Sequence, residues 1–172
     1  MNLQSTDFEL FDVPARFAQD RGLLDARWKA LQAAAHPDRF VGEGAAAKRA
    51  AMQWAVRINE AYQRLKDPLR RAAYLCALNG SAVDAQDNQA MPPDFLMQQM
   101  QWREALEESV DGAHIDALAD KVAARERTML RELADLIDQR ADWPGAARQV
   151  QALMFIVRFN QDIDRRREAL EQ

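Results

Sequence analysis

"AAAHPDRFVGEG", residues 33–44, contains the feature that decides the fold. Its three alanines favour a helix, but they run into His36 and Pro37, and proline lacks the amide donor that the next helical turn needs. The residue before a proline is also disfavoured in the α conformation, so the helix must end near His36. Gly42 and Gly44 then precede a second alanine-rich stretch. The pattern predicts a helical hairpin with His-Pro-Asp at its exposed tip.

Further helices are predicted on both sides of this tip. Apolar residues recur with helical spacing before it, at Leu24, Trp28, Leu31 and Ala35. A long helix from about residue 45 to 65 is expected after it. Thr6 and Glu9 have the spacing of a capping box, which predicts a short first helix. Asp67 followed by Pro68 predicts the capped start of a fourth helix.

The chain is expected to be all-α and to contain two domains. Residues 1–80 form the predicted four-helix domain, and "SAVDAQDNQAMPP", residues 81–93, has the weak apolar content of a linker. Residues 94–172 contain three further helical stretches, at about 94–110, 115–142 and 144 to the C-terminus. Short turns between them favour an antiparallel three-helix bundle.

Composition excludes several classes of site. The apolar runs are shorter than the roughly 20 residues of a membrane-spanning helix, and no signal sequence is recognisable, so we expect a cytoplasmic protein. Cys76 is the only cysteine, and His36 and His114 are the only histidines. We therefore expect no disulfide, no zinc site and no cofactor. Cys76 lies among apolar neighbours and is expected to be a buried thiol, whereas His114 is expected at the surface or in a helix cap.

Charge is distributed unevenly along the chain. Residues 1–80 carry 12 Lys+Arg against 9 Asp+Glu, a net charge of +3, and residues 81–172 carry 11 against 18, a net charge of −7. The two halves are therefore expected to contact different partners. A nucleic-acid-binding protein would present a dense basic stripe, but here acidic residues are interspersed with the basic ones, so we expect no nucleic-acid partner.

An enzymatic role is the alternative from a different functional class. His36 and Asp38 are suited to acid-base chemistry, but a general base needs a pocket and an oriented substrate, and a hairpin tip supplies neither. The acids of "REALEESVDG", residues 103–112, have no fixed geometry for catalysis and are expected to be solvated. We therefore expect a protein without catalytic activity of its own.

The helix predicted over residues 94–110 has two apolar faces. At about 100° per residue, one stripe is expected to face the core: Phe95, Trp102, Leu106 and Val110. A second face mixes large apolar residues with polar ones: Leu96, Met97, Met100, Gln101, Glu104 and Glu108. Methionine adapts to irregular partners, so this second face is a candidate binding surface. The alternative is that it packs against the other domain.

The last helix shows one apolar stripe and one aromatic residue outside it. The stripe expected to face the core contains Val150, Leu153, Ile156, Val157 and Ile163. Phe155 falls well away from this stripe on a helical projection. We therefore expect Phe155 to be available to a partner.

The helix order and three longer motifs carry a resemblance to a known family. A short aromatic helix, a helix ending in His-Pro-Asp, a long helix and a short fourth helix together resemble the J-domain, which stimulates ATP hydrolysis by DnaK-type chaperones. The motifs "LFDVPARF" (10–17), "RINEAYQRLKDPLRRAAYL" (57–75) and "FLMQQMQWREALEE" (95–108) resemble the HscB family of iron-sulfur cluster assembly co-chaperones. This resemblance covers nearly the whole chain.

The resemblance implies two partners and assigns residues to each. A DnaK-type, HscA-like chaperone would contact the tip and the basic second helix, at His36, Pro37, Asp38, Arg39, Arg27 and Lys29. An IscU-like scaffold protein would contact the C-terminal domain, at Leu96, Met97, Met100, Gln101, Glu104, Glu108 and Phe155. Arg27 and Lys29 are alternatively part of a merely solvated helix face, and a J-protein for a different client is the alternative within the same functional class.

Overall fold

The computed structural model describes residues 2–84 and 91–172, and every regular element in these two ranges is helical. The chain divides into two compact units, Met1–Leu75 and Cys76–Gln172. The division falls inside α4 (Pro68–Leu78), before residue 80, the expected end of the first domain. Much of the expected linker, residues 85–90, lies outside the described residues.

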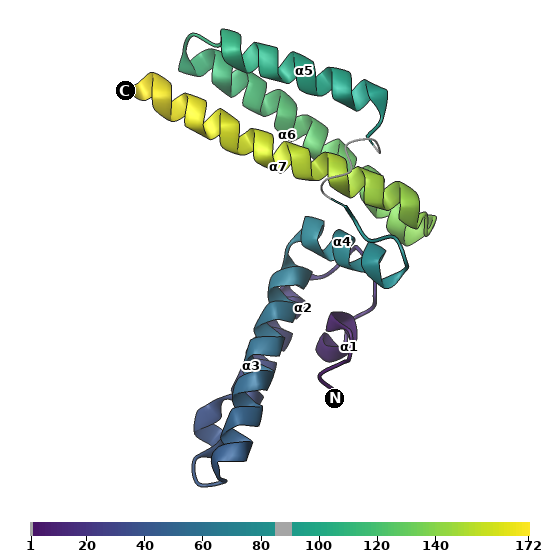
Figure 1. The fold of residues 1–172 in the computed structure, drawn as a ribbon, viewed down its shortest axis with the longest axis vertical. Helices are drawn as coiled ribbons and strands as arrows, with labels where there is room; N and C mark the ends of the chain where they lie inside the picture. The colour runs from purple at the N-terminus through teal and green to yellow at the C-terminus, as the bar shows by residue number, and fades with distance from the viewer. Residues whose placement is uncertain (1, 85–90) are drawn as a thin grey trace. The chain divides into compact units, whose positions relative to one another are not determined.

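The N-terminal unit is built around a helical hairpin (Figure 1). Its elements are α1 (Asp7–Phe11), α2 (Arg21–Ala35), the short 3-10 helix η1 (Pro37–Phe40), α3 (Ala45–Lys66) and the first part of α4. The Thr6 hydroxyl accepts a hydrogen bond from the Glu9 amide at 3.1 Å, and the Asp67 carboxylate accepts from the amides of Leu69 and Arg70. The predicted caps of the first and fourth helices are therefore confirmed.

Aromatic side chains hold α1, α2 and α3 together. The Tyr62 ring stacks between Trp28 of α2 and Phe11 of α1, with ring centroids 4.6 Å and 6.5 Å away. Its hydroxyl donates to the Asp25 carboxylate at 2.5 Å, a hydrogen bond that raises the pKa of Tyr62 and lowers that of Asp25. The predicted apolar stripe of α2 thus packs on α3 through a shared aromatic stack.

A buried ion cluster, which the sequence did not predict, joins α1 to α3. The Asp7 carboxylate is completely buried and lies 2.8 Å from Arg57 and 2.7 Å from Arg64. Its hydrogen bonds raise the pKa of the Arg64 guanidinium. Removing the carboxylate would leave two largely buried cations without their counter-charge, so Asp7 is structural.

The C-terminal unit is a three-helix bundle (Figure 1). After the end of α4 it contains α5 (Pro93–Glu108), α6 (Gly112–Ala134), the π-helical turn η3 (Asp135–Gln139) and α7 (Trp143–Glu171). Asp111 caps α6 and Asp142 caps α7. The last helix therefore begins at Trp143, one residue before its predicted start at residue 144. His114 is exposed, and its ring lies 2.6 Å from Asp111 at the start of α6, as predicted.

The bundle core confirms part of the predicted stripes and corrects the rest. Trp102 of α5 stacks on Phe159 of α7, and the two ring centroids are 5.8 Å apart. Val110 is exposed because α5 ends at Glu108, before the stripe reaches it. Val157 is also exposed, on the solvent side of α7. The predictions that Val110 and Val157 belong to the core are therefore wrong.

Cys76, near the end of α4, is buried. Its side chain is completely buried, and burial raises the pKa of the thiol to about 11. A thiolate is therefore strongly disfavoured at neutral pH, as expected for a structural cysteine. None of the helices over the described residues combines the length and the apolar character that crossing a bilayer requires.

Candidate functional site

The His-Pro-Asp sequence lies at the junction between α2 and η1, at the end of the hairpin. His36 is the C-terminal cap of α2, and Pro37 is the first residue of η1. The His36 Nδ1 atom accepts a hydrogen bond from the Asp38 amide at 3.2 Å. The side chains of His36 and Asp38 are 59% and 87% exposed, so neither contributes to the core.

Local hydrogen bonds and two glycines give the tip its conformation. The Arg39 amide donates to the His36 carbonyl at 3.0 Å, and the Arg39 guanidinium donates to the carbonyl of Ala33 at 3.4 Å. Gly42 and Gly44 have φ angles of +96° and +97°, which side-chain-bearing residues rarely adopt. The loop is thus ordered by its own backbone and by α2, and its polar side chains are left free to contact a partner.

Arg27 and Lys29, the two residues of α2 assigned to the chaperone, point to different sides of the helix. Arg27 and Lys29 are both exposed, and Arg27 lies 3.7 Å from Asp12. Residues two positions apart do not share a helical face. Lys29 precedes His36 by seven residues, or two turns, and therefore lies on the His36 side. On this projection Lys29 lies on the side of α2 that leads to the tip, two turns before it, and Arg27 lies on another side.

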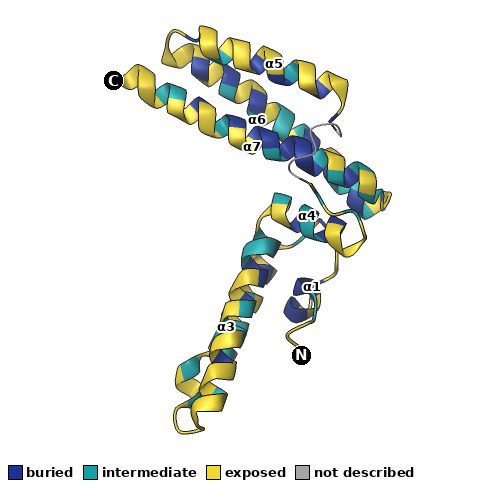
Figure 2. Ribbon diagram, in the orientation of Figure 1, coloured by how far each residue is buried: buried dark blue, intermediate teal, exposed yellow. Residues whose placement is uncertain are grey.

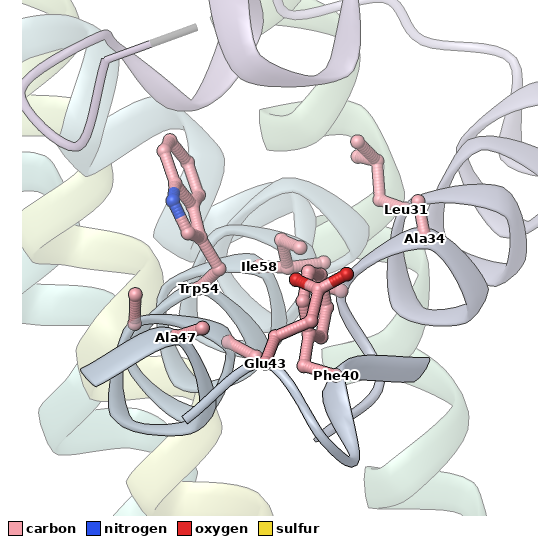
Figure 3. A pocket seen from close by; sticks show the side chains of 10 residues that line it. Leu31, Ala34, Phe40, Glu43, Ala47, Trp54 and Ile58 are labelled. Atoms are coloured by element: carbon pink, nitrogen blue, oxygen red, sulfur yellow. The ribbon is translucent and has the colours of Figure 1, made fainter. Parts of the chain in front are cut away.

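An apolar hollow lies between α2 and α3 near the tip (Figure 3). It has a volume of about 490 Å³. Its walls include Leu31, Ala34, Phe40, Glu43 and Trp54. Small alanine side chains at the end of α2 and the start of α3 leave this space open, since they reach less far than the surrounding aromatic rings.

The second apolar face of α5 is exposed, as predicted. Leu96, Met97 and Met100 are 39%, 62% and 71% exposed. Gln101, Glu104 and Glu108 are exposed beside them. Figure 2 shows that much of α5 is coloured as exposed. These three apolar side chains, Leu96, Met97 and Met100, are exposed among the described residues of the C-terminal unit, and we call them the α5 face.

Phe155 does not lie on the surface, so the prediction of an exposed aromatic residue is wrong. It is only 7% exposed. Its ring packs edge-on against Phe95 and stacks with Phe159, at centroid distances of 5.9 Å and 6.0 Å. α7 packs against both α5 and α6, so its buried face is wider than one stripe and includes Phe155.

A groove borders the buried aromatic rings between α5 and α7. Its volume is about 490 Å³, and Leu96, Phe155 and Phe159 form part of its lining. Three arginines also line it: Arg103 from α5, and Arg158 and Arg165 from α7. The sequence did not single out these arginines, because charged residues at helical surface positions carry no pattern that distinguishes a binding site from solvated surface.

Sequence comparison with known proteins identifies relatives of the whole chain. It is 48% identical to the co-chaperone protein HscB homolog of Burkholderia thailandensis over 99% of both chains. It is 45% identical to the corresponding protein of Burkholderia cenocepacia, again over 99% of both chains. The chain belongs to the HscB family. The predicted family resemblance is therefore confirmed.

The family model and solved structures agree with this assignment. Residues 91–164 match the HSCB C-terminal oligomerisation domain. The fold is similar to that of the chaperone HscB from Vibrio cholerae, with a TM-score of 0.83, 38% identity and coverage of 96% of this chain and 99% of that one. Human co-chaperone protein HscB shares the fold at a TM-score of 0.88 and 24% identity, covering 95% of this chain and 83% of that one. The all-α prediction for the HscB-family chain is confirmed.

Proposed function

We propose that this HscB-family co-chaperone of iron-sulfur cluster assembly joins two partners, an HscA-like DnaK-type chaperone and an IscU-like scaffold protein. The N-terminal unit stimulates ATP hydrolysis by the chaperone. The C-terminal unit holds the scaffold and delivers it. The protein has no catalytic activity of its own, uses no cofactor, and works in the cytoplasm without nucleic-acid or membrane partners.

The exposed tip is the observation that carries the chaperone half of the proposal. The Asp38 amide donates to the His36 ring and the Arg39 amide donates to the His36 carbonyl, which orders the tip, yet the side chains of His36 and Asp38 are largely exposed. A preordered loop loses little conformational entropy on binding, which favours docking. Arg39 adds positive charge at the tip, Lys29 adds it two turns earlier on the His36 side of α2, and Arg27 adds it on another side of α2.

The α5 face supports the scaffold half of the proposal. Leu96, Met97 and Met100 form an exposed apolar strip, with Gln101, Glu104 and Glu108 as its polar border. Exposed apolar strips with a polar border are typical of protein interfaces. Phe155 is assigned a supporting role, because its buried ring packs beneath α5 rather than reaching the partner.

An ATPase assay with purified proteins tests this function. The HscA-like chaperone from the same organism should hydrolyse ATP faster when the co-chaperone is added, and faster still with both co-chaperone and scaffold. The co-chaperone alone should hydrolyse no ATP. A pull-down from cell extract should recover both partners. Stimulation without any scaffold binding would indicate a J-protein for a different client.

A further inference from the structure

The groove between α5 and α7 carries charge of the opposite sign to the half of the chain that forms it. Residues 81–172 have a net charge of −7, yet Arg103, Arg158 and Arg165 all line this groove. Among the described residues that line it, Asp162 is the only acidic one, and it pairs with Arg165 at 3.2 Å. A local excess of positive charge on an acidic surface selects for an acidic partner group.

Two of these arginines have no acidic partner within the described residues. Arg103 is exposed, and its guanidinium carbon lies 5.6 Å from the centroid of the Phe155 ring. Arg158 is also exposed and lines the same groove, about one turn after Phe155 on α7. Neither side chain forms an ion pair or hydrogen bond with a carboxylate in residues 2–84 or 91–172. Both keep their donors available for an external carboxylate.

The contact with Phe155 prepares Arg103 for binding. A guanidinium over an aromatic face is restrained by the ring, while its N–H groups remain free at the edge. Such a group forms paired, charge-assisted hydrogen bonds with a carboxylate at reduced entropic cost. Phe155 is buried, but its ring therefore helps to orient the exposed guanidinium of Arg103.

Positions around α5 place the apolar strip between two regions of opposite charge. With Leu96 at zero and about 100° per residue, Arg103 falls near 340°, Met100 near 40°, Glu104 near 80° and Glu108 near 120°. The basic groove thus borders Leu96 and Met100 on one side. The two glutamates lie on the other side, where they flank Met97 near 100°. A partner that covers the strip meets a positive edge and a negative edge.

We propose that the groove binds an acidic segment of the scaffold protein and thereby fixes its orientation on the α5 face. This inference rests on the proposed function, because it assumes that the scaffold covers Leu96 and Met100. The carboxylates of the segment pair with Arg103 and Arg158, and neighbouring apolar side chains contact the aromatic lining. Arg165 is already paired with Asp162 and contributes less.

Charge reversal tests the proposal against a matched control. The variant Arg103→Glu/Arg158→Glu changes the net charge by the same amount as Arg127→Glu/Arg148→Glu, whose two positions are exposed and do not line the groove. Scaffold affinity is measured by titration calorimetry for full-length protein at low and high salt. We expect the groove variant to lose at least tenfold in affinity at low salt and the control to lose less than threefold. The difference should shrink at high salt because screening weakens exposed charge pairs.

Chemical cross-linking identifies the occupant of the groove. Carbodiimide joins an amine to a carboxylate, and Lys121 is the only lysine in residues 81–172. The variant Arg158→Lys places an amine at the groove, and we expect a cross-link from position 158 to an Asp or Glu of the scaffold. A cross-link to a second copy of this chain, with self-association lost in Arg103→Glu/Arg158→Glu, would instead identify a self-interface and overturn the proposal.

The variant Leu96→Ala/Met100→Ala separates failure of this inference from failure of the proposed function. If it weakens scaffold binding while the groove variant behaves like its control, the scaffold uses the α5 face and not the groove. If neither variant changes scaffold affinity, both the α5 face and the groove are wrongly assigned. Equal melting temperatures of all variants by circular dichroism are required for each comparison.

Discussion

The hairpin tip and the α5 face present side chains to partners in different ways. At the tip, the Asp38 amide donates to the His36 ring, and both side chains are largely exposed. At the α5 face, exposed Leu96 lies beside buried Phe155 in the same groove, and Phe155 packs on Phe95 and Phe159. Substitutions at the tip can therefore remove function without loss of stability. Substitutions near α5 divide into those that affect binding and those that affect the fold.

The largest expected effect is at the tip. His36→Gln should abolish stimulation of the chaperone's ATPase, because the substitution removes the imidazole from a loop whose geometry the partner must recognise. Helical content and melting temperature should stay within the small range of surface substitutions, about 0.5 kcal/mol or less. The measurement combines steady-state ATPase rates with thermal unfolding by circular dichroism.

His114→Gln is the matched control for the tip. His114 is also an exposed histidine beside an aspartate, but it lies in the first turn of α6 in the other unit. This variant should stimulate the chaperone normally. Full stimulation by folded His36→Gln would show that the tip is not the contact that activates the chaperone.

The second largest effect is on stability, at Phe155. Phe155→Ala should lower the free energy of unfolding by about 3 to 5 kcal/mol, the usual cost of truncating a buried phenylalanine. Trp102→Ala should cost a similar amount, since Trp102 belongs to the same aromatic cluster. Chemical unfolding followed by circular dichroism measures both. A Phe155→Ala protein of unchanged stability that binds no scaffold would restore Phe155 as a surface contact.

The third effect is on affinity alone. Leu96→Ala/Met100→Ala removes exposed apolar area without opening a core cavity, so melting should change little. Central apolar anchors commonly cost more than about 1 kcal/mol each when truncated, which predicts a loss of scaffold affinity of roughly thirtyfold. Titration calorimetry measures it, and ATPase stimulation without scaffold should be unchanged. Marked destabilisation would mean that these side chains are packed within the protein instead.

Residues that begin or end helices made most of the fold predictable from sequence. The break at His36-Pro37 and the caps at Thr6 and Asp67 are local signals, and each is observed where it was predicted. Exposure of Leu96, Met97 and Met100 also followed from the spacing of apolar residues along one helix. These features depend on a few neighbouring residues, so sequence alone was sufficient for them.

Features that depend on several helices were not predictable in this way. A projection of α7 alone could not show that two helices pack on it, and Phe155 was therefore placed on the surface. Asp7 resembles an ordinary acidic residue in a first helical turn, and its two arginine partners lie 50 and 57 positions further along the chain. The same holds for the groove arginines, which α5 and α7 bring together only in the folded bundle.

The smallest expected effect distinguishes Arg27 from Lys29 on α2. Lys29 lies on the His36 side of the helix and Arg27 does not, so Lys29→Ala should weaken chaperone docking a few-fold and Arg27→Ala should weaken it less. Exposed ion pairs contribute about 0.2 to 1 kcal/mol and are screened by salt, so the Lys29→Ala effect should vanish as ionic strength rises. Surface plasmon resonance at two salt concentrations measures both variants, with scaffold affinity as the internal control. Equal effects of the two substitutions would mean that the chaperone senses the overall charge of α2 rather than one side of it.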